Sequence, residues 1–139
     1  MREILFRGKR ADNGEWVEGS LFQDIDSGYF VIEYFDYYTD ESGLQKDFCQ
    51  YNVIPETVGQ YTGLNDKNGN KIFEGDILSA MNENIYAEVK YNDEKAAFFI
   101  ENDDGDGYFG EEYDTDIDIV GNIHDNPELL NRRVDNGKV

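Results

Sequence analysis

The chain has few of the residues that crosslink a fold or bind metals. Among its 139 residues there is one cysteine, Cys49, and one histidine, His124, so an internal disulfide is impossible and a zinc site has too few ligands. A lone cysteine in the strand-like run 48–51 is typical of an inert thiol in a reducing compartment. The sequence has no apolar run near the ~18 residues of a membrane span, and Met1 opens no signal peptide. These absences predict a cytoplasmic protein that does not enter a membrane.

Catalytic groups are equally scarce. Any general-base mechanism would depend on His124, which lies between Ile123 and Asp125 at a predicted strand-to-helix turn, where a histidine is ordinarily structural or solvent-facing. The sequence has no glycine-rich loop leading into a helix with Lys and Ser or Thr, which is the pattern that binds phosphate. Carboxylate pairs are so numerous that none of them is specific. We therefore expect no enzyme activity and no cofactor.

Positive charge is the third shortage. The chain holds 12 Lys and Arg against 31 Asp and Glu, for a net charge of −19. Such a surface repels phosphates, and the only concentrated basic runs are residues 7–10 and 132–133, so we do not expect direct binding to DNA or RNA. High negative charge often serves only solubility. The more specific alternative is that the acidic surface is complementary to a basic surface on a partner protein.

The residues that are abundant predict strands and turns. Short apolar and aromatic runs at 4–6, 16–18, 29–38, 46–54, 86–91, 96–101 and 116–123 are typical of β-strands. Glycine-rich turns separate them, including Asn13-Gly14 and Asn68-Gly69. Both Asn-Gly pairs predict hairpins, and for Asn68-Gly69 we expect a type I′ turn, which needs positive φ at both central residues. Glu74-Gly75-Asp76 predicts a second reversal, in which the Asp carboxylate binds nearby backbone N–H groups.

Three blocks of the sequence together resemble the YopX family of phage and prophage proteins. The central block is Thr62-Gly63-Leu64, residues 66–69, Ile72 and residues 74–77; residues 2–21 and 120–130 resemble the family's N-terminal hairpin and C-terminal close. The resemblance implies a phage or prophage origin, and thus a host bacterial cell, but it implies no catalytic residue. The signature positions that we expect to be structural are Gly63, Asn68, Gly69, Gly75, Asp76, Gly121 and Pro127.

These patterns predict an all-β protein with a single YopX-like domain over residues 1–139. We expect residues 1–55 to form a β-hairpin extension and residues 56–126 a small, partly open SH3-like barrel. Pro127 then begins a short C-terminal helix over 127–133 with Asp125 or Asn126 as the N-cap. The tail 134–139 is expected to be frayed.

Aromatic residues gather on one predicted hairpin in the first half. Because a strand alternates its faces, a hairpin with this many rings is not expected to bury all of them in one core. Exposed rings are favoured at protein interfaces, although cross-strand pairs within the domain are an equally good interpretation. The hairpin is also a candidate surface for self-association. The candidate interface residues are Tyr34, Phe35, Tyr37, Tyr38, Phe48 and Tyr51.

Acidic residues gather in the segment 101–118, which contains no Lys or Arg. Asn102, Asp104 and Asp106 match part of a calcium-binding EF-hand loop, but Tyr113 stands where the bidentate Glu is needed. A second frame from Asp114 places Ile119 at the required Gly. We therefore predict no metal site and a flexible loop over 103–107. The candidate acidic patch is Asp103, Asp104, Asp106, Glu111, Glu112, Asp114 and Asp116.

Three functions are compatible with these features. We expect a non-enzymatic phage accessory protein that binds a host or phage protein, with a homo-oligomer as an open alternative. The second hypothesis is an acidic decoy that imitates DNA and occupies a host DNA-binding protein, because a mimic needs dense rows of carboxylates. The third and weakest is a metal-dependent hydrolase that uses Asp104, Asp106 and the acids near Asp116.

Overall fold

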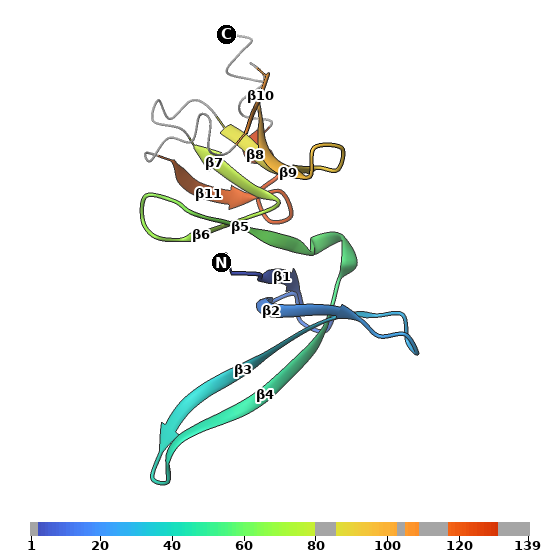
Figure 1. The fold of residues 1–139 in the computed structure, drawn as a ribbon, viewed down its shortest axis with the longest axis vertical. Helices are drawn as coiled ribbons and strands as arrows, with labels where there is room; N and C mark the ends of the chain where they lie inside the picture. Colours follow the sequence, from blue (N-terminus) through green and yellow to red (C-terminus); the bar gives the residue numbers. More distant parts are fainter. Residues whose placement is uncertain (1–2, 80–85, 103–104, 109–116, 131–139) are drawn as a thin grey trace. The chain divides into compact units, whose positions relative to one another are not determined.

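The computed structural model describes residues 3–79, 86–102, 105–108 and 117–130. The chain divides into two compact units, Met1–Gln60 and Tyr61–Val139, which we call unit 1 and unit 2. Figure 1 shows the strands of both units. The strands form two antiparallel sheets, so the prediction of an all-β protein is confirmed.

Unit 1 is an antiparallel meander in which each strand pairs with the next. The hairpin predicted around Asn13-Gly14 is present, with Lys9 opposite Trp16 and Gly14 at a φ of +76°. Its elements are β1 (Phe6–Lys9), β2 (Trp16–Gln23), β3 (Phe30–Asp40), β4 (Gly43–Val53) and the short 3₁₀ helix η1 (Pro55–Thr57).

The end of β1 also returns to the end of β4, which closes the base of unit 1. The Ala11 N–H donates to the Asn52 carbonyl at 2.9 Å, and the Ile54 N–H donates to the Lys9 carbonyl at 2.9 Å. A small core of Val17, Ile32 and Val53 lies inside this base. Burial of these aliphatic side chains is the main stabilising contribution to unit 1, at about 25 cal/mol for each Å² removed from water.

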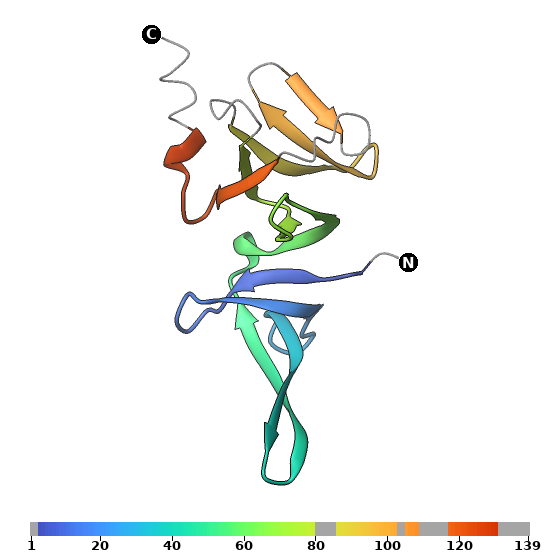
Figure 2. The same cartoon turned by 90° about the vertical axis from the view of Figure 1, so that its left-hand side faces the viewer.

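β3 and β4 extend far beyond this core. Each has eleven residues, but β2 pairs with β3 only as far as the Ser20–Glu33 pair. From there the two strands continue alone to the Asp40–Gly43 pair, and no third strand joins them among the described residues. We call residues 34–49 the arm; Figures 1 and 2 show it as a long twisted ribbon.

Unit 2 contains most of β5 (Gly59–Asn65), β6 and a five-stranded antiparallel sheet with the order β10-β9-β8-β7-β11. Its core cluster is Ile72, Leu78, Val89 and Ile117. The strands are β6 (Lys71–Phe73), β7 (Asp76–Ser79), β8 (Tyr86–Asn92), β9 (Ala97–Asn102), β10 (Gly105–Tyr108) and β11 (Asp118–Asn122).

The hairpin predicted at Asn68-Gly69 connects β5 to β6, but the predicted turn type is wrong. Gly69 has a φ of +85°, whereas Ala96 is the one described non-glycine residue with positive φ. The Gly69 N–H donates to the Asp66 carbonyl at 3.0 Å, so Lys67 and Asn68 are the central residues of the turn. Asp66 causes the difference, because its carboxylate accepts the Asn68 N–H at 2.9 Å and favours a type I turn with Asp first and Gly last.

The predicted corner at Glu74-Gly75-Asp76 is present between β6 and β7. Gly75 has a φ of +93°, and the Asp76 carboxylate, almost fully buried, accepts the Phe73 N–H at 2.7 Å. Two other signature glycines lie at irregular pairing: Gly63 has a φ of +91° within β5, and Gly121 follows a register shift in β11. These signature positions therefore shape the backbone of unit 2.

The remaining sequence predictions have mixed outcomes. The sheets do not close into a full barrel over the described residues, which agrees with the partly open arrangement that was predicted. A helix begins at Glu128 directly after Pro127, while residues 131–133 and the tail 134–139 lie outside the described part.

The loop predicted over 103–107 is wrong at Gly105–Gly107, because these residues pair with β9 as β10. The division of the chain falls after Gln60 rather than at Pro55, and the single domain stays a prediction.

Candidate functional site

The arm presents two chemically different faces. Residues that lie opposite each other share a face, and successive residues alternate. We call one side the aromatic face; it carries Phe35, Tyr37, Thr39, Leu44, Lys46 and Phe48. We call the other side the acidic face; it carries Asp36, Tyr38, Asp40, Gln45 and Asp47.

The aromatic face is a cluster of rings open to solvent. Phe35 and Phe48 lie directly opposite each other with ring centroids 5.6 Å apart, yet remain 48% and 56% exposed. Tyr37 is 61% exposed, and its ring lies 6.3 Å from that of Phe35. The Lys46 ammonium lies 4.7 Å above the Phe35 ring. A cross-strand aromatic pair stabilises a ribbon modestly, and half of its apolar surface is still available to a partner.

The acidic face carries an unfavourable pair. Asp36 and Asp47 lie directly opposite each other, where like charges destabilise a hairpin. Tyr38 donates its hydroxyl to Asp47 at 3.5 Å, a long contact on an exposed surface. This face therefore favours a cationic neighbour, although it lacks the convergent geometry of a metal site.

Two of the six predicted interface residues belong to the base of the arm instead. Tyr34 and Tyr51 are half-buried against the core of unit 1, with ring centroids 6.2 Å apart. Burial raises the pKa of Tyr34. The Arg10 guanidinium lies 3.9 Å above the Tyr51 ring and donates two hydrogen bonds to Asp12, at 2.9 and 2.7 Å. Those hydrogen bonds lower the pKa of Asp12, so the base is held by stacking and charge together.

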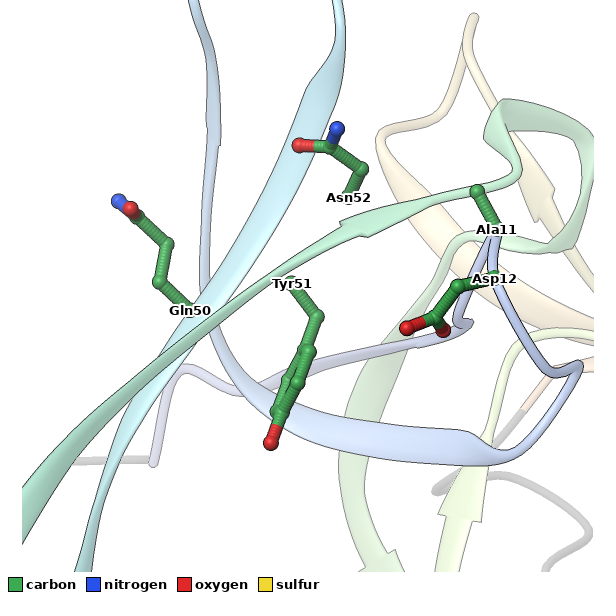
Figure 3. A pocket seen from close by; sticks show the side chains of 5 residues that line it. All are labelled: Ala11, Asp12, Gln50, Tyr51 and Asn52. Carbon is green, nitrogen blue, oxygen red and sulfur yellow. The ribbon is translucent and has the colours of Figure 1, made fainter.

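A hollow of about 450 Å³ lies beside this base, lined by Ala11, Asp12, Gln50, Tyr51 and Asn52. Figure 3 shows that Gln50 and Asn52 point away from β4 on the side opposite to Tyr51. The polar groups therefore do not converge on one centre, as a catalytic or ligand-binding pocket requires.

The basic run 7–10 is also occupied within unit 1. Arg7 and Lys9 lie against the Trp16 ring at 4.8 and 5.5 Å, and Arg10 is bound to Asp12. The Trp16 ring is half-buried and carries these cations on its face. A run used in this way is a poor platform for nucleic acid.

The predicted acidic patch lies largely outside the described residues: Asp103, Asp104, Glu111, Glu112, Asp114 and Asp116 fall there, and only the backbone of Asp106 is described, in β10. Within the described part, no group of three or more His, Cys, Asp or Glu is arranged to hold a metal ion.

His124 lies in a turn where the Asn122 side chain accepts its backbone N–H at 2.9 Å. Over the described residues, no helix has the length and apolar character to cross a membrane.

Sequence reasoning missed three residues of the arm surface: Leu44, which is 72% exposed, Lys46 and Asp47. It also could not show that Asp47 lies directly opposite Asp36. Asp36 and Asp40 stand an even number of residues apart and therefore share a face of an extended strand, which was a readable signal, but assigning residues of the opposite strand to that face needed the register of β4.

The structure defines an all-β protein whose exposed two-stranded arm is its most distinctive surface. The chain belongs to the YopX family: the model of that family, described as YopX protein, matches residues 5–131. The chain is also similar to the crystal structure of protein EF1440 from Enterococcus faecalis, with 28% identity and a TM-score of 0.59 over 94% of this chain and 99% of that chain. No protein with a curated description matches the chain. The family resemblance noted in the sequence is thus confirmed.

Proposed function

We propose that this protein is a non-enzymatic phage or prophage accessory protein that acts by binding another protein through its arm. The supporting observation is the solvent exposure of Phe35, Tyr37 and Phe48 on a ribbon that no further strand joins among the described residues. Exposed rings contribute little to folding, whereas burying them against a partner removes apolar area at low entropic cost.

The arm has the properties of a recognition element. A two-stranded ribbon is marginally stable by itself, but this one continues directly from the cored base of unit 1. Tyr is among the residues that most often dominate binding energy at interfaces, and Phe is enriched at interfaces relative to the rest of the protein surface. The rigid base and the exposed rings together favour docking over a structural role.

The charge of the arm supports a partner with a basic surface. Asp36, Asp40 and Asp47 share one face, and the whole chain has a net charge of −19. Opposite charge on a partner accelerates encounter and excludes wrong partners, and the effect weakens as salt rises.

The test is affinity capture from the lysate of a bacterial host. We expect retention of a partner by the wild type and loss with the double variant Tyr37→Ser/Phe48→Ser, while Tyr91→Ser, at a 39% exposed ring of β8, retains it. Retention by all three proteins would contradict the arm as the binding element.

The same assay separates the decoy hypothesis. A DNA mimic would displace DNA from a host DNA-binding protein in a salt-sensitive way, and substitution of Asp103, Asp104 and Asp106 by Asn would weaken that displacement. We expect instead that these substitutions leave arm-dependent capture unchanged.

A further inference from the structure

We infer that the aromatic face of the arm docks onto the same face of a second copy of this chain, with the two arms antiparallel. The inference goes beyond the proposed function, because it assigns one face of the arm to self-association. A different protein that buries the same rings would therefore have to displace the second copy, whereas a basic partner could still reach the acidic face.

The separation of charge between the faces supports this occupant. Asp36, Asp40 and Asp47 all lie on the acidic face, so they point away from a contact made through the aromatic face. On the side of the aromatic face, the charged residues are Glu33 and Lys46, one of each sign. A contact between two aromatic faces therefore brings together rings and balanced charge rather than opposed carboxylates.

The positions of these two charges make the surface self-complementary. Glu33 lies two residues from Phe35 toward the base of the arm, and Lys46 lies two residues from Phe48 toward its tip. A two-fold axis between the two faces, running across the strands at the Phe35–Phe48 pair, exchanges base and tip. With the axis square to the strands Lys46 would face Gln50 of the other copy, so the two arms must cross at roughly 30–40° for Lys46 of each copy to meet Glu33 of the other. A surface that pairs with itself under a two-fold rotation is the requirement for a symmetric dimer, and sheets packed face to face keep their strands within about 30° of alignment.

The available area predicts a weak dimer. At roughly 200 Å² for each large aromatic side chain, the half-exposed Phe35, Tyr37 and Phe48 with Leu44 offer on the order of 400 Å² per copy. The total of roughly 800 Å² lies below the ~1,200 Å² or more that stable specific interfaces bury, in the range of weak and transient contacts. We therefore expect dissociation in the micromolar range rather than a permanent dimer.

Net charge sets the direction of the salt effect. Two copies at −19 each repel at low ionic strength, and salt screens that repulsion while leaving apolar burial intact. Self-association should therefore strengthen as salt rises. Binding of a basic partner to the acidic face should weaken over the same range.

The experiment is sedimentation equilibrium of the full chain over a range of concentrations, at about 50 mM and about 500 mM salt, which bracket strong and weak screening. We expect a monomer–dimer equilibrium that is tighter at high salt and at least about tenfold weaker in Tyr37→Ser/Phe48→Ser. The control Asp36→Asn, on the acidic face, should dimerise at least as well as the wild type.

A charge exchange tests the symmetry directly. Glu33→Lys and Lys46→Glu should each weaken the dimer several-fold, and the double variant Glu33→Lys/Lys46→Glu should restore it, because each copy then offers the reversed pair. Near-ultraviolet circular dichroism checks that every variant is folded.

Two results would overturn the inference: a monomer at both salt concentrations, or a double variant that dimerises no better than the single ones. Neither result tests whether the arm captures a different protein. Conversely, a salt-strengthened dimer without any captured partner would reject the proposed function alone.

Discussion

One buried carboxylate, that of Asp66, holds together two parts of unit 2 that are far apart in the sequence. Its Oδ1 accepts the Asn68 and Asn70 N–H groups at 2.9 Å each, and its Oδ2 accepts the Ile119 N–H of β11 at 3.2 Å. The neighbouring Lys67 N–H donates to the Ile117 carbonyl at 3.0 Å. The β5–β6 turn and β11 are therefore joined through a side chain rather than through strand pairing alone.

Removing this carboxylate should destabilise unit 2 strongly. In Asp66→Ala the N–H groups of Asn68, Asn70 and Ile119 lose their charged acceptor, and we expect a loss of roughly 3 kcal/mol in the free energy of unfolding. Urea unfolding followed by circular dichroism measures it. Asp93→Ala, at an exposed turn position, is the control and should change stability by less than about 0.5 kcal/mol; equal effects of the two substitutions would contradict this role.

The same group should make stability depend on acid. Burial by itself raises the pKa of Asp66, but the N–H groups of Asn70, Ile119 and Asn68 outweigh it, so the pKa lies below its ordinary value. A carboxyl with a lowered pKa contributes stability that is fully present above the unfolded pKa of about 3.9 and is lost as pH falls through the folded pKa. Unfolding free energies measured from pH 6 to pH 3 should therefore fall less steeply in Asp66→Asn than in the wild type.

Residue-level predictability was limited by such contacts. The Gly at 69, the reversal at Gly75 and the binding of backbone N–H by Asp76 follow from local chemistry, and each was predicted. The type I′ turn was wrong because the prediction used the Asn68-Gly69 pair alone and left out Asp66, whose carboxylate accepts the Asn68 N–H. The contact of Asp66 with Ile119, far away in the sequence, needs the fold.

At the scale of elements, the base of the arm depends on close contact between β2 and β3. Gly19 on β2 lies against the backbone of Glu33, and a Cβ at this position would overlap the Glu33 carbonyl oxygen and also meet the Ile32 side chain at 3.2 Å. Only glycine allows the strands to approach here.

Gly19→Ala should therefore push β2 away from β3. We expect a loss of about 3 kcal/mol in the free energy of unfolding, at the upper end for an overpacked site, with faster hydrogen exchange at the β2–β3 pairs. Ser20→Ala, at the next and exposed residue of the same strand, serves as the control. Unchanged exchange in Gly19→Ala would show that the strands can shift without cost.

The sequence predicted that the hairpin exists, but not which rings are exposed. Val31 and Ile32 are adjacent and both buried, so the alternation that normally marks an inward face is lost at the base of β3. Tyr34 and Phe35 were therefore equivalent in the sequence. Both residues lie beyond the last β2–β3 pair, Ser20–Glu33. Tyr34 packs against the core of unit 1, whereas Phe35 is exposed on the other face.

At the scale of the whole molecule, net charge opposes compactness. A chain at −19 gains stability when salt screens repulsion between its carboxylates. The thermal midpoint measured by calorimetry should rise between about 20 and 300 mM sodium chloride, a range over which the screening length falls severalfold. A midpoint that falls with salt would mean that attractive ion pairs outweigh the repulsion.

The β class was predictable because turn chemistry recurs along the whole chain, and the YopX family was predictable because three blocks of the sequence resemble it. The division after Gln60 was not, because β5 runs through it without a break in composition. The two cores form from residues of separate halves, Val17, Ile32 and Val53 in one and Ile72, Leu78 and Val89 in the other, and hydrophobicity alone does not assign them.

The alternating faces of the arm restrict how its length can change in evolution. One residue added to β3 between Glu33 and Phe35, together with one added to β4 between Phe48 and Gln50, would turn every side chain nearer the tip to the opposite face. The rings would then exchange places with the carboxylates. Insertions and deletions in functional relatives should therefore come in even numbers within each strand. An odd change in one lineage would signal that its arm meets a different surface.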